Sequence, residues 1–213
     1  MGNVKIKICG ISDGAAMDAA IDAGADYAGL VFYPPSPRHI GSNDAALLAE
    51  RSARRIARVG LFVDADDTQI GDAVAAGRLD ALQLHGSETP GRAADLRARF
   101  GLPVWKAIAV SSASDVERAE QYAGAADLIL FDARTPKGTL PGGMGLSFDW
   151  SLLRHYRGSL PWGLAGGIAP ANVAHAIAQT GAPLVDVSSG VESAPGVKDP
   201  ARIKAFVSAV RKG

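Results

Sequence analysis

The chain has 213 residues, 47% of them hydrophobic and 21% charged, and its length fits one globular domain over residues 1–213. Lys plus Arg and Asp plus Glu each number 22, and the zero formal net charge at pH 7 gives no sign of a nucleic-acid or anionic-membrane partner. One cysteine excludes an intramolecular disulfide. Because the sequence has neither a signal-peptide pattern nor an apolar run of roughly 18–20 residues, we expect a cytoplasmic protein.

Short runs rich in leucine and β-branched residues alternate along the chain with alanine-rich stretches that carry charges. The short runs predict eight strands, at Val4–Cys9, Tyr27–Tyr33, Arg58–Val63, Ala81–His85, Val104–Val110, Leu128–Asp132, Pro161–Ala165 and Leu184–Ser188. The stretches between them predict helices, at Asp13–Ala23, Ser42–Ala57, Asp67–Ala76, Glu88–Phe100, Ser111–Ala123, Asp149–Tyr156, Ala171–Gln179 and Ala201–Arg211. Strict alternation implies a parallel sheet of the α/β class, and eight repeats favour a (βα)8 TIM barrel over an open doubly wound sheet.

Helix-capping residues flank several of these stretches. Ser, Asn and Asp are favoured N-caps and glycine is a favoured stop. The N-cap candidates are Ser42 to Asp44, Asp66 with Asp67, and Ser111 with Ser112, and the stop candidates are Gly24, Gly77, Gly101, Gly124 and Gly181.

The alternation of side chains along each strand predicts which residues enter the barrel. If the wholly apolar face of each strand packs on the helices, the other face points inward and places Cys9, His85, Asp132 and Ser188 at the C-terminal mouth. Barrel enzymes carry their chemistry at that end. Lys7 and Asp186 lie one layer deeper on strands that become neighbours when the barrel closes, and since a buried charge needs a partner, we expect them to pair.

Several distinctive segments follow one another from the first strand to the last helix: Lys7–Ile11, Phe32–Arg38, Leu82–Gly86, Leu130–Asp132, Gly142–Gly145, Phe148–Trp150, Leu164–Ile168, Val185–Glu192 and Pro195–Asp199. Together they resemble the phosphoribosylanthranilate isomerase family. The chain departs from the family at Met144, where a threonine is usual, which puts one hydroxyl contact in doubt.

The resemblance implies an Amadori rearrangement in tryptophan biosynthesis, in which an aminoaldose becomes an aminoketose without a metal or other cofactor. It assigns Asp132 as the general acid that protonates the furanose ring oxygen, a task that requires a carboxyl bearing a proton near neutral pH. It assigns Cys9 as the general base that takes the proton from C2′. Without the resemblance, a lone buried cysteine is more often only a small hydrophobic residue.

The resemblance also implies a binding site for a small sugar-phosphate substrate. Arg38 would hold the anthranilate carboxylate, since a guanidinium fork matches a planar carboxylate. Lys7 and Asp186 count among the substrate-binding candidates, and His85 is expected to be a hydrogen-bonded residue of the pocket lining rather than a catalytic one. The phosphate would bind backbone amides of glycine-rich turns, with the candidates Gly143, Gly145, Gly166, Gly167, Ser189 and Gly190.

Other functions fit the residues less well. The histidine-pathway isomerase family carries out the same chemistry but has an aspartate where Cys9 stands, and other sugar-phosphate barrels need a different placement of acid and base. A barrel that only binds a phosphorylated ligand would need neither Cys9 nor Asp132. His39, His155 and His175 form no ligand pattern, so no metal site is expected. The sequence leaves a monomer and a homodimer equally open.

Overall fold

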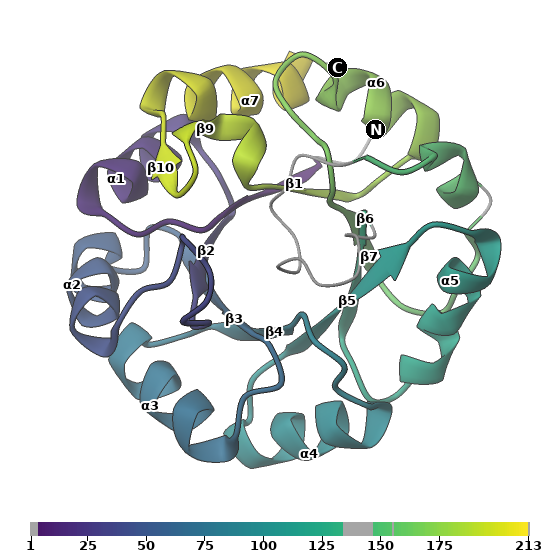
Figure 1. The fold of residues 1–213 in the computed structure, drawn as a ribbon. Coiled ribbons are helices and arrows are strands. Elements are labelled where there is room, and N and C mark those ends of the chain that lie inside the picture. Colours follow the sequence, from purple (N-terminus) through teal and green to yellow (C-terminus); the bar gives the residue numbers. More distant parts are fainter. Residues whose placement is uncertain (1–3, 134–146, 155, 213) are drawn as a thin grey trace.

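A closed barrel of eight parallel strands forms the centre of the computed structural model, which describes residues 4–133, 147–154 and 156–212 (Figure 1). The strands pair in sequence order, and the last pairs with the first. They are β1 (Lys5–Cys9), β2 (Tyr27–Val31), β3 (Ala57–Phe62), β4 (Ala81–Leu84), β5 (Val104–Val110), β6 (Leu128–Ala133), β7 (Trp162–Leu164) and β8 (Leu184–Val187). The predicted barrel is confirmed, and the open sheet is excluded by the pairing of Lys7 with Asp186 across the closure.

The helices surround the ring of strands, and α7 packs beside α1 where the barrel closes (Figure 1). The α-helices are α1 (Gly14–Ala23), α2 (Ser42–Ser52), α3 (Asp67–Gly77), α4 (Pro90–Phe100), α5 (Ala113–Glu117), α6 (Val173–Thr180) and α7 (Pro200–Lys212). The described residues also form the 3-10 helices η1 (Arg118–Tyr122), η2 (Trp150–Leu153) and η3 (Ser189–Val191). Among the described residues, none of the helices has the length and apolar character needed to cross a bilayer.

The second helix was predicted to run to Ala57 but ends at Ser52. Ala53 and Arg54 have φ angles of 40° and 66°, in the left-handed region that stops a helix, and the amide of Ala53 bonds back to Ala49. Ala57 instead begins β3, where it pairs with Tyr27. The arginines of this segment favour a helix locally, but the extended conformation wins because closing the barrel requires Ala57 in the sheet.

The fifth and sixth predicted helices are also shorter than expected. Only Ala113–Glu117 is α-helical in the fifth, which continues as η1 and directs the Tyr122 hydroxyl to the carbonyl of Glu88 at 2.7 Å. The sixth is reduced to η2, capped by Asp149, whose side chain accepts from the amide of Ser151 at 2.9 Å. A local side-chain cap of this kind stabilises a single turn without requiring a longer helix.

Some cap predictions are confirmed and others are wrong. Asp66 and Ser112 are N-caps, and Gly24, Gly101 and Gly181 are left-handed C-caps. Gly41 rather than Ser42 precedes α2, and Gly77 is the last residue of α3, with Arg78 as its cap. Gly124 has a φ of 77° but lies one residue beyond Ala123, the C-cap of η1.

The core has a helix-facing layer outside the sheet and a smaller one inside the barrel. Ile6 and Ile8 belong to the outer layer. Inside, Trp105 and Leu130 belong to one cluster, and Cys9 belongs to a second with Val31 and Leu61. The predicted alternation of faces is therefore confirmed, since the sulfur of Cys9 lies inside the barrel and not among the helices.

An antiparallel hairpin that we did not predict follows β8. It consists of β9 (Glu192–Ala194) and β10 (Val197–Lys198), and its register places Lys198 opposite Glu192. Pro195 and Gly196 form its turn, and the φ of 82° at Gly196 belongs to the left-handed region that glycine tolerates. The hairpin places two charged side chains beside the end of β8.

Candidate active site

Cys9 is the last residue of β1, is 6% exposed and lies inside the barrel, above a buried ion pair. The Lys7 ammonium lies 2.9 Å from Asp186 Oδ2, and the pair predicted from the sequence is thereby confirmed. Both the Cys9 sulfur and the Lys7 ammonium pack against Gly29 of β2. A methyl group added at Gly29 would lie 2.9 Å from the sulfur and 3.0 Å from the ammonium nitrogen. Only glycine therefore leaves room for this arrangement.

The protonation of Cys9 is set by opposing effects. Burial raises the pKa of the Cys9 thiol, and Asp186 adds to the rise, while the cations of Lys7 and Lys198 lower it. The net direction of the shift is upward, because burial outweighs the two lysines. The pKa of Lys7 is raised, because Asp186 and Cys9 together outweigh the effect of its burial. Both shifts favour a neutral Cys9 thiol beside a charged Lys7 ammonium.

A second group of buried charges, brought by the β9–β10 hairpin, lies on the same side of the mouth. Glu192 is bonded by both Nε and Nη2 of Arg38, at 2.7 and 2.8 Å, and by Lys198 at 2.5 Å. Lys198 also donates to the carbonyl and hydroxyl oxygens of Ser188. Although burial acts against its charge, the two cations hold the pKa of Glu192 below its usual range.

Arg38 reaches the mouth by crossing Gly10, the residue after Cys9. A methyl group at Gly10 would lie 2.6 Å from Cδ of Arg38, so the arginine stem packs directly on this turn. Arg38 is 8% exposed, and its guanidinium already makes a two-point contact with Glu192. A ligand carboxylate approaching Arg38 would therefore bind beside an internal carboxylate.

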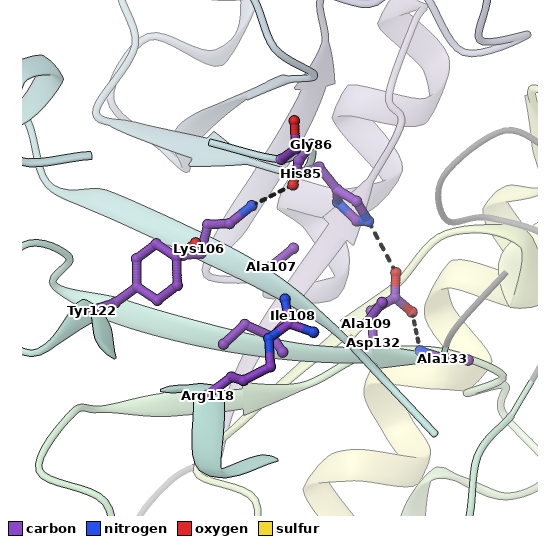
Figure 2. Close-up of a pocket in the computed structure, with 11 residues that line it drawn as sticks. His85, Gly86, Lys106, Ala107, Ile108, Ala109, Arg118, Tyr122, Asp132 and Ala133 are labelled. Carbon is purple, nitrogen blue, oxygen red and sulfur yellow. Dashed lines mark hydrogen bonds and ion pairs between the residues drawn. The ribbon is translucent and has the colours of Figure 1, made fainter. Parts of the chain in front are cut away.

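The opposite side of the mouth carries Asp132 of β6 and His85, which follows β4. His85 Nε2 lies 3.2 Å from Asp132 Oδ2, and Asp132 Oδ1 accepts from the amide of Ala133 at 2.8 Å (Figure 2). The other ring nitrogen of His85, Nδ1, lies 3.1 Å from Nε2 of Gln83. His85 and Asp132 line a pocket of about 230 Å³. His85 is thus hydrogen-bonded and lines a pocket, while its predicted part in substrate binding stays a prediction.

Glu88 fixes the position of the turn that holds His85. The Glu88 carboxylate accepts from the amides of Asp64 and Gly86, each at 2.9 Å, and from Lys106 Nζ at 2.9 Å. Lys106 also donates to the carbonyl of Gly86 at 2.7 Å (Figure 2). Because every oxygen of this buried carboxylate is used, the backbone beside His85 has a defined position.

The loops after β7 and β8 lie between the Cys9 side and the Asp132 side. Gly166 and Gly167 have φ angles of 78° and 67°, and a methyl group at Gly166 would lie 2.8 Å from Asp132 Oδ1. Gly190 packs against the carbonyl of Ile168, so the two loops touch. The predicted phosphate-binding residues Gly166, Gly167, Ser189 and Gly190 are thus brought together. Gly143 and Gly145, with Met144, lie outside the described residues.

The sequence pattern did not identify Gln83, Glu192 and Lys198 as neighbours of these candidate residues. The alternation of side chains places Gln83 on the inward face of its strand, together with His85. A neutral amide, however, does not by itself indicate a chemical role. The turn-forming pair Pro195 and Gly196 could have revealed the hairpin that carries Lys198.

Comparison with known proteins agrees with this geometry. The family model described as N-(5'phosphoribosyl)anthranilate (PRA) isomerase matches residues 6–209. An N-(5'-phosphoribosyl)anthranilate isomerase of Paramagnetospirillum magneticum is 55% identical over 211 residues, 99% of this chain and 98% of the relative. The crystal structure of phosphoribosyl anthranilate isomerase from Thermotoga maritima has a TM-score of 0.89 and 38% identity, covering 99% of this chain and 100% of that one. A phosphoribosyl anthranilate isomerase in complex with reduced 1-(o-carboxyphenylamino)-1-deoxyribulose 5-phosphate has a TM-score of 0.86 and 36% identity, with the same coverage. The chain belongs to the N-(5'-phosphoribosyl)anthranilate isomerase family.

Proposed function

We propose that this protein isomerises N-(5'-phosphoribosyl)anthranilate to 1-(2-carboxyphenylamino)-1-deoxyribulose 5-phosphate, a step of tryptophan biosynthesis. The observation that supports this most is the placement of a thiol and a carboxyl inside one barrel mouth. Cys9 on β1 and Asp132 on β6 are separated by β7 and β8, whose following loops carry the glycine-rich turns. A phosphate held at these loops would leave its ribose between the two groups.

Asp132 is proposed to start the reaction by giving its proton to the ring oxygen of the aminoaldose. The C1′–oxygen bond then breaks, and the nitrogen lone pair forms a cationic Schiff base. Cys9, as thiolate, takes the proton from C2′, and the electron pair of that bond neutralises the iminium to give an enolamine. Tautomerisation moves a proton to C1′ and leaves a ketone at C2′, so no external oxidant or reductant is required.

Because the pKa of the Cys9 thiol is raised, the thiolate that acts as the base has to be stabilised by nearby positive charge. Lys7 and Lys198 favour the thiolate, and the cationic Schiff base adds a third positive charge once the ring has opened. Ring opening therefore precedes efficient proton removal in this scheme.

The remaining residues are proposed to hold the two ends of the substrate. Arg38 would contact the anthranilate carboxylate beside Glu192, and the backbone amides of Gly166, Gly167, Ser189 and Gly190 would contact the phosphate, joined by Gly143 and Gly145. Lys7 and Asp186 remain substrate-binding candidates, although they already form an ion pair with each other. Oriented amides bind phosphate without a counter-charge from a side chain.

The assembly and location of the protein are further proposals. A phosphoribosylanthranilate isomerase from Thermotoga maritima is described as dimeric, and a monomer or a homodimer stays open for this chain. We propose a cytoplasmic enzyme that acts on a small sugar phosphate without nucleic acid, membrane or cofactor.

The test is a turnover assay on purified protein with phosphoribosylanthranilate generated in situ and anthranilate fluorescence as the signal. We expect consumption of the substrate and inhibition by inorganic phosphate. A rate no faster than that of a sample without protein would refute the proposed function. Activity that phosphate does not inhibit would refute the proposed anion site alone.

A further inference from the structure

Gln83 lies two residues before His85, inside the barrel on β4. The residue is 1% exposed, and its Nε2 is 3.1 Å from Nδ1 of His85. The amide oxygen of Gln83 has no hydrogen-bond partner among the described residues. In the structure the NH2 group is the half of the amide that faces the histidine ring.

The positions of the protons follow from the two partners of the ring. Asp132 Oδ2 can accept a hydrogen bond whether or not the other oxygen of the carboxyl carries a proton, so we place a proton on His85 Nε2, at 3.2 Å. The NH2 group of Gln83 can only donate, so Nδ1 must accept and carries none. Gln83 and Asp132 together select the neutral ring with its proton on Nε2.

A second proton on His85 would conflict with Gln83. An imidazolium has an N–H on both nitrogens, so Nδ1–H would face another donor 3.1 Å away in a buried site. Two opposed donors without an acceptor are unfavourable where water does not compensate them. Gln83 therefore disfavours the charged form of His85.

The other ionisable groups among the described residues of this pocket are engaged elsewhere. Lys106 on β5 is paired with Glu88 at 2.9 Å. On η1, Arg118 is paired with Asp115 at 3.4 Å, and the Tyr122 hydroxyl donates to the carbonyl of Glu88. The contacts that decide the protonation of His85 are thus those with Gln83 and Asp132.

We propose that Gln83 is a positioning residue that keeps His85 neutral so that Asp132 can act as a proton donor. A neutral ring orients the Asp132 carboxyl through a single hydrogen bond. An imidazolium would instead hold that carboxyl in its ionised form, which has no proton to give. This inference rests on the proposed role of Asp132 as the general acid.

The experiment compares Gln83→Glu with wild-type protein. Glutamate has the same shape but accepts from Nδ1–H, so it favours the imidazolium. We expect kcat near neutral pH to fall at least about tenfold with KM little changed, since general acid catalysis is worth about 10²–10⁴-fold. In ¹⁵N NMR spectra, with His85→Asn used to assign the signal, His85 should carry a proton on Nε2 alone in wild type and on both nitrogens in the variant.

Gln83→Met and a double variant serve as controls. Methionine fills the space without donor or acceptor, so the ring stays neutral and kcat should fall less than in Gln83→Glu. In the His85→Asn background, Gln83→Glu should cause little further loss, whereas a merely structural effect would persist.

Two outcomes would overturn the inference while the proposed function stands. They are a wild-type His85 with its proton on Nδ1 or on both nitrogens, and a Gln83→Glu variant with unchanged spectrum and kcat. A wild-type protein that shows the expected tautomer but no turnover would instead refute the proposed function, and the catalytic role of Gln83 with it.

Discussion

The two sides of the barrel mouth are built from different interactions. On the β1–β8 side, buried ion pairs join Lys7 with Asp186 at 2.9 Å and Lys198 with Glu192 at 2.5 Å. On the β4–β6 side, a chain of hydrogen bonds links Gln83 and His85 to Asp132. Removing one member of a buried ion pair leaves a costly unpaired charge, whereas the hydrogen bonds on the β4–β6 side do not depend on a fixed opposite charge. The proposed base, Cys9, therefore lies in a fixed electrostatic environment, and the proposed acid, Asp132, does not.

The largest effect is expected on the β4–β6 side, from Asp132→Asn. Asparagine keeps the shape and the bond from His85 but cannot deliver the proton that opens the ring, so kcat should fall by about 10²–10⁴-fold. Binding of a reduced product analogue, measured by calorimetry, should be nearly unchanged. Asp95→Asn, at an exposed position of α4, is the matched control. Near-normal turnover of Asp132→Asn would remove the acid assignment.

Cys9→Ser tests the β1–β8 side. A serine hydroxyl fits the space but is a far weaker acid than a thiol, so its anion is scarcely formed even beside Lys7. We expect a loss of kcat of about 10²-fold or more, as for other proton-transfer groups, while affinity for the same product analogue survives. Equal loss of affinity and rate would mark Cys9 as a packing residue.

Lys7→Met and Asp186→Asn should shift the ionisation of Cys9 in opposite directions. Lys7 lowers and Asp186 raises the pKa of the Cys9 thiol. The rise of kcat/KM with pH, which reports the free enzyme, should therefore move to higher pH in Lys7→Met and to lower pH in Asp186→Asn. Lys5→Met is the control, because Lys5 is exposed and paired with Asp26. Shifts of the same sign in both variants would contradict this account.

Most of the fold could be predicted from the sequence, because each strand and helix has a recognisable local pattern of residues. The eight runs, the inward faces and the pair of Lys7 with Asp186 required only alternation and closure of the barrel. The end of α2 could not be predicted in this way, since Ala53 to Ala57 leave the helix to satisfy pairing with β2. Tertiary pairing there overrides local helix preference.

The site was predictable only where a residue's chemistry is distinctive. The place of Cys9 and Asp132 at the barrel mouth could be predicted from their strand ends, and their roles are proposed from the family resemblance, but the neighbours that contact them could not be predicted. Gln83 acts through the position of its NH2 group, and Lys198 reaches Glu192 only because an antiparallel hairpin folds back. Such roles depend on distances of a few ångströms between segments, which spacing along one chain does not encode.

The smallest effect on turnover is expected from Glu192→Gln, which removes the acceptor shared by Arg38 and Lys198. Two buried cations then lack their carboxylate, so Tm near neutral pH should fall. Arg38 also loses its two-point support, and we expect KM for phosphoribosylanthranilate to rise by about threefold to tenfold, with kcat changed less, as for a lost binding contact.

The pH dependence separates this ion pair from a merely local loss of packing. Arg38 and Lys198 hold the pKa of Glu192 below its unfolded value, so the folded state binds protons less readily than the unfolded one. The stabilisation is present above the unfolded pKa of glutamate and is lost as pH falls through the lower, folded pKa. The difference in Tm between wild type and Glu192→Gln should therefore shrink on acidification. Asp18→Asn, which breaks the exposed pair with Arg51, should show only a small difference at any pH. A Glu192→Gln difference that stays constant with pH would mean that packing, and not charge, holds the hairpin against Arg38.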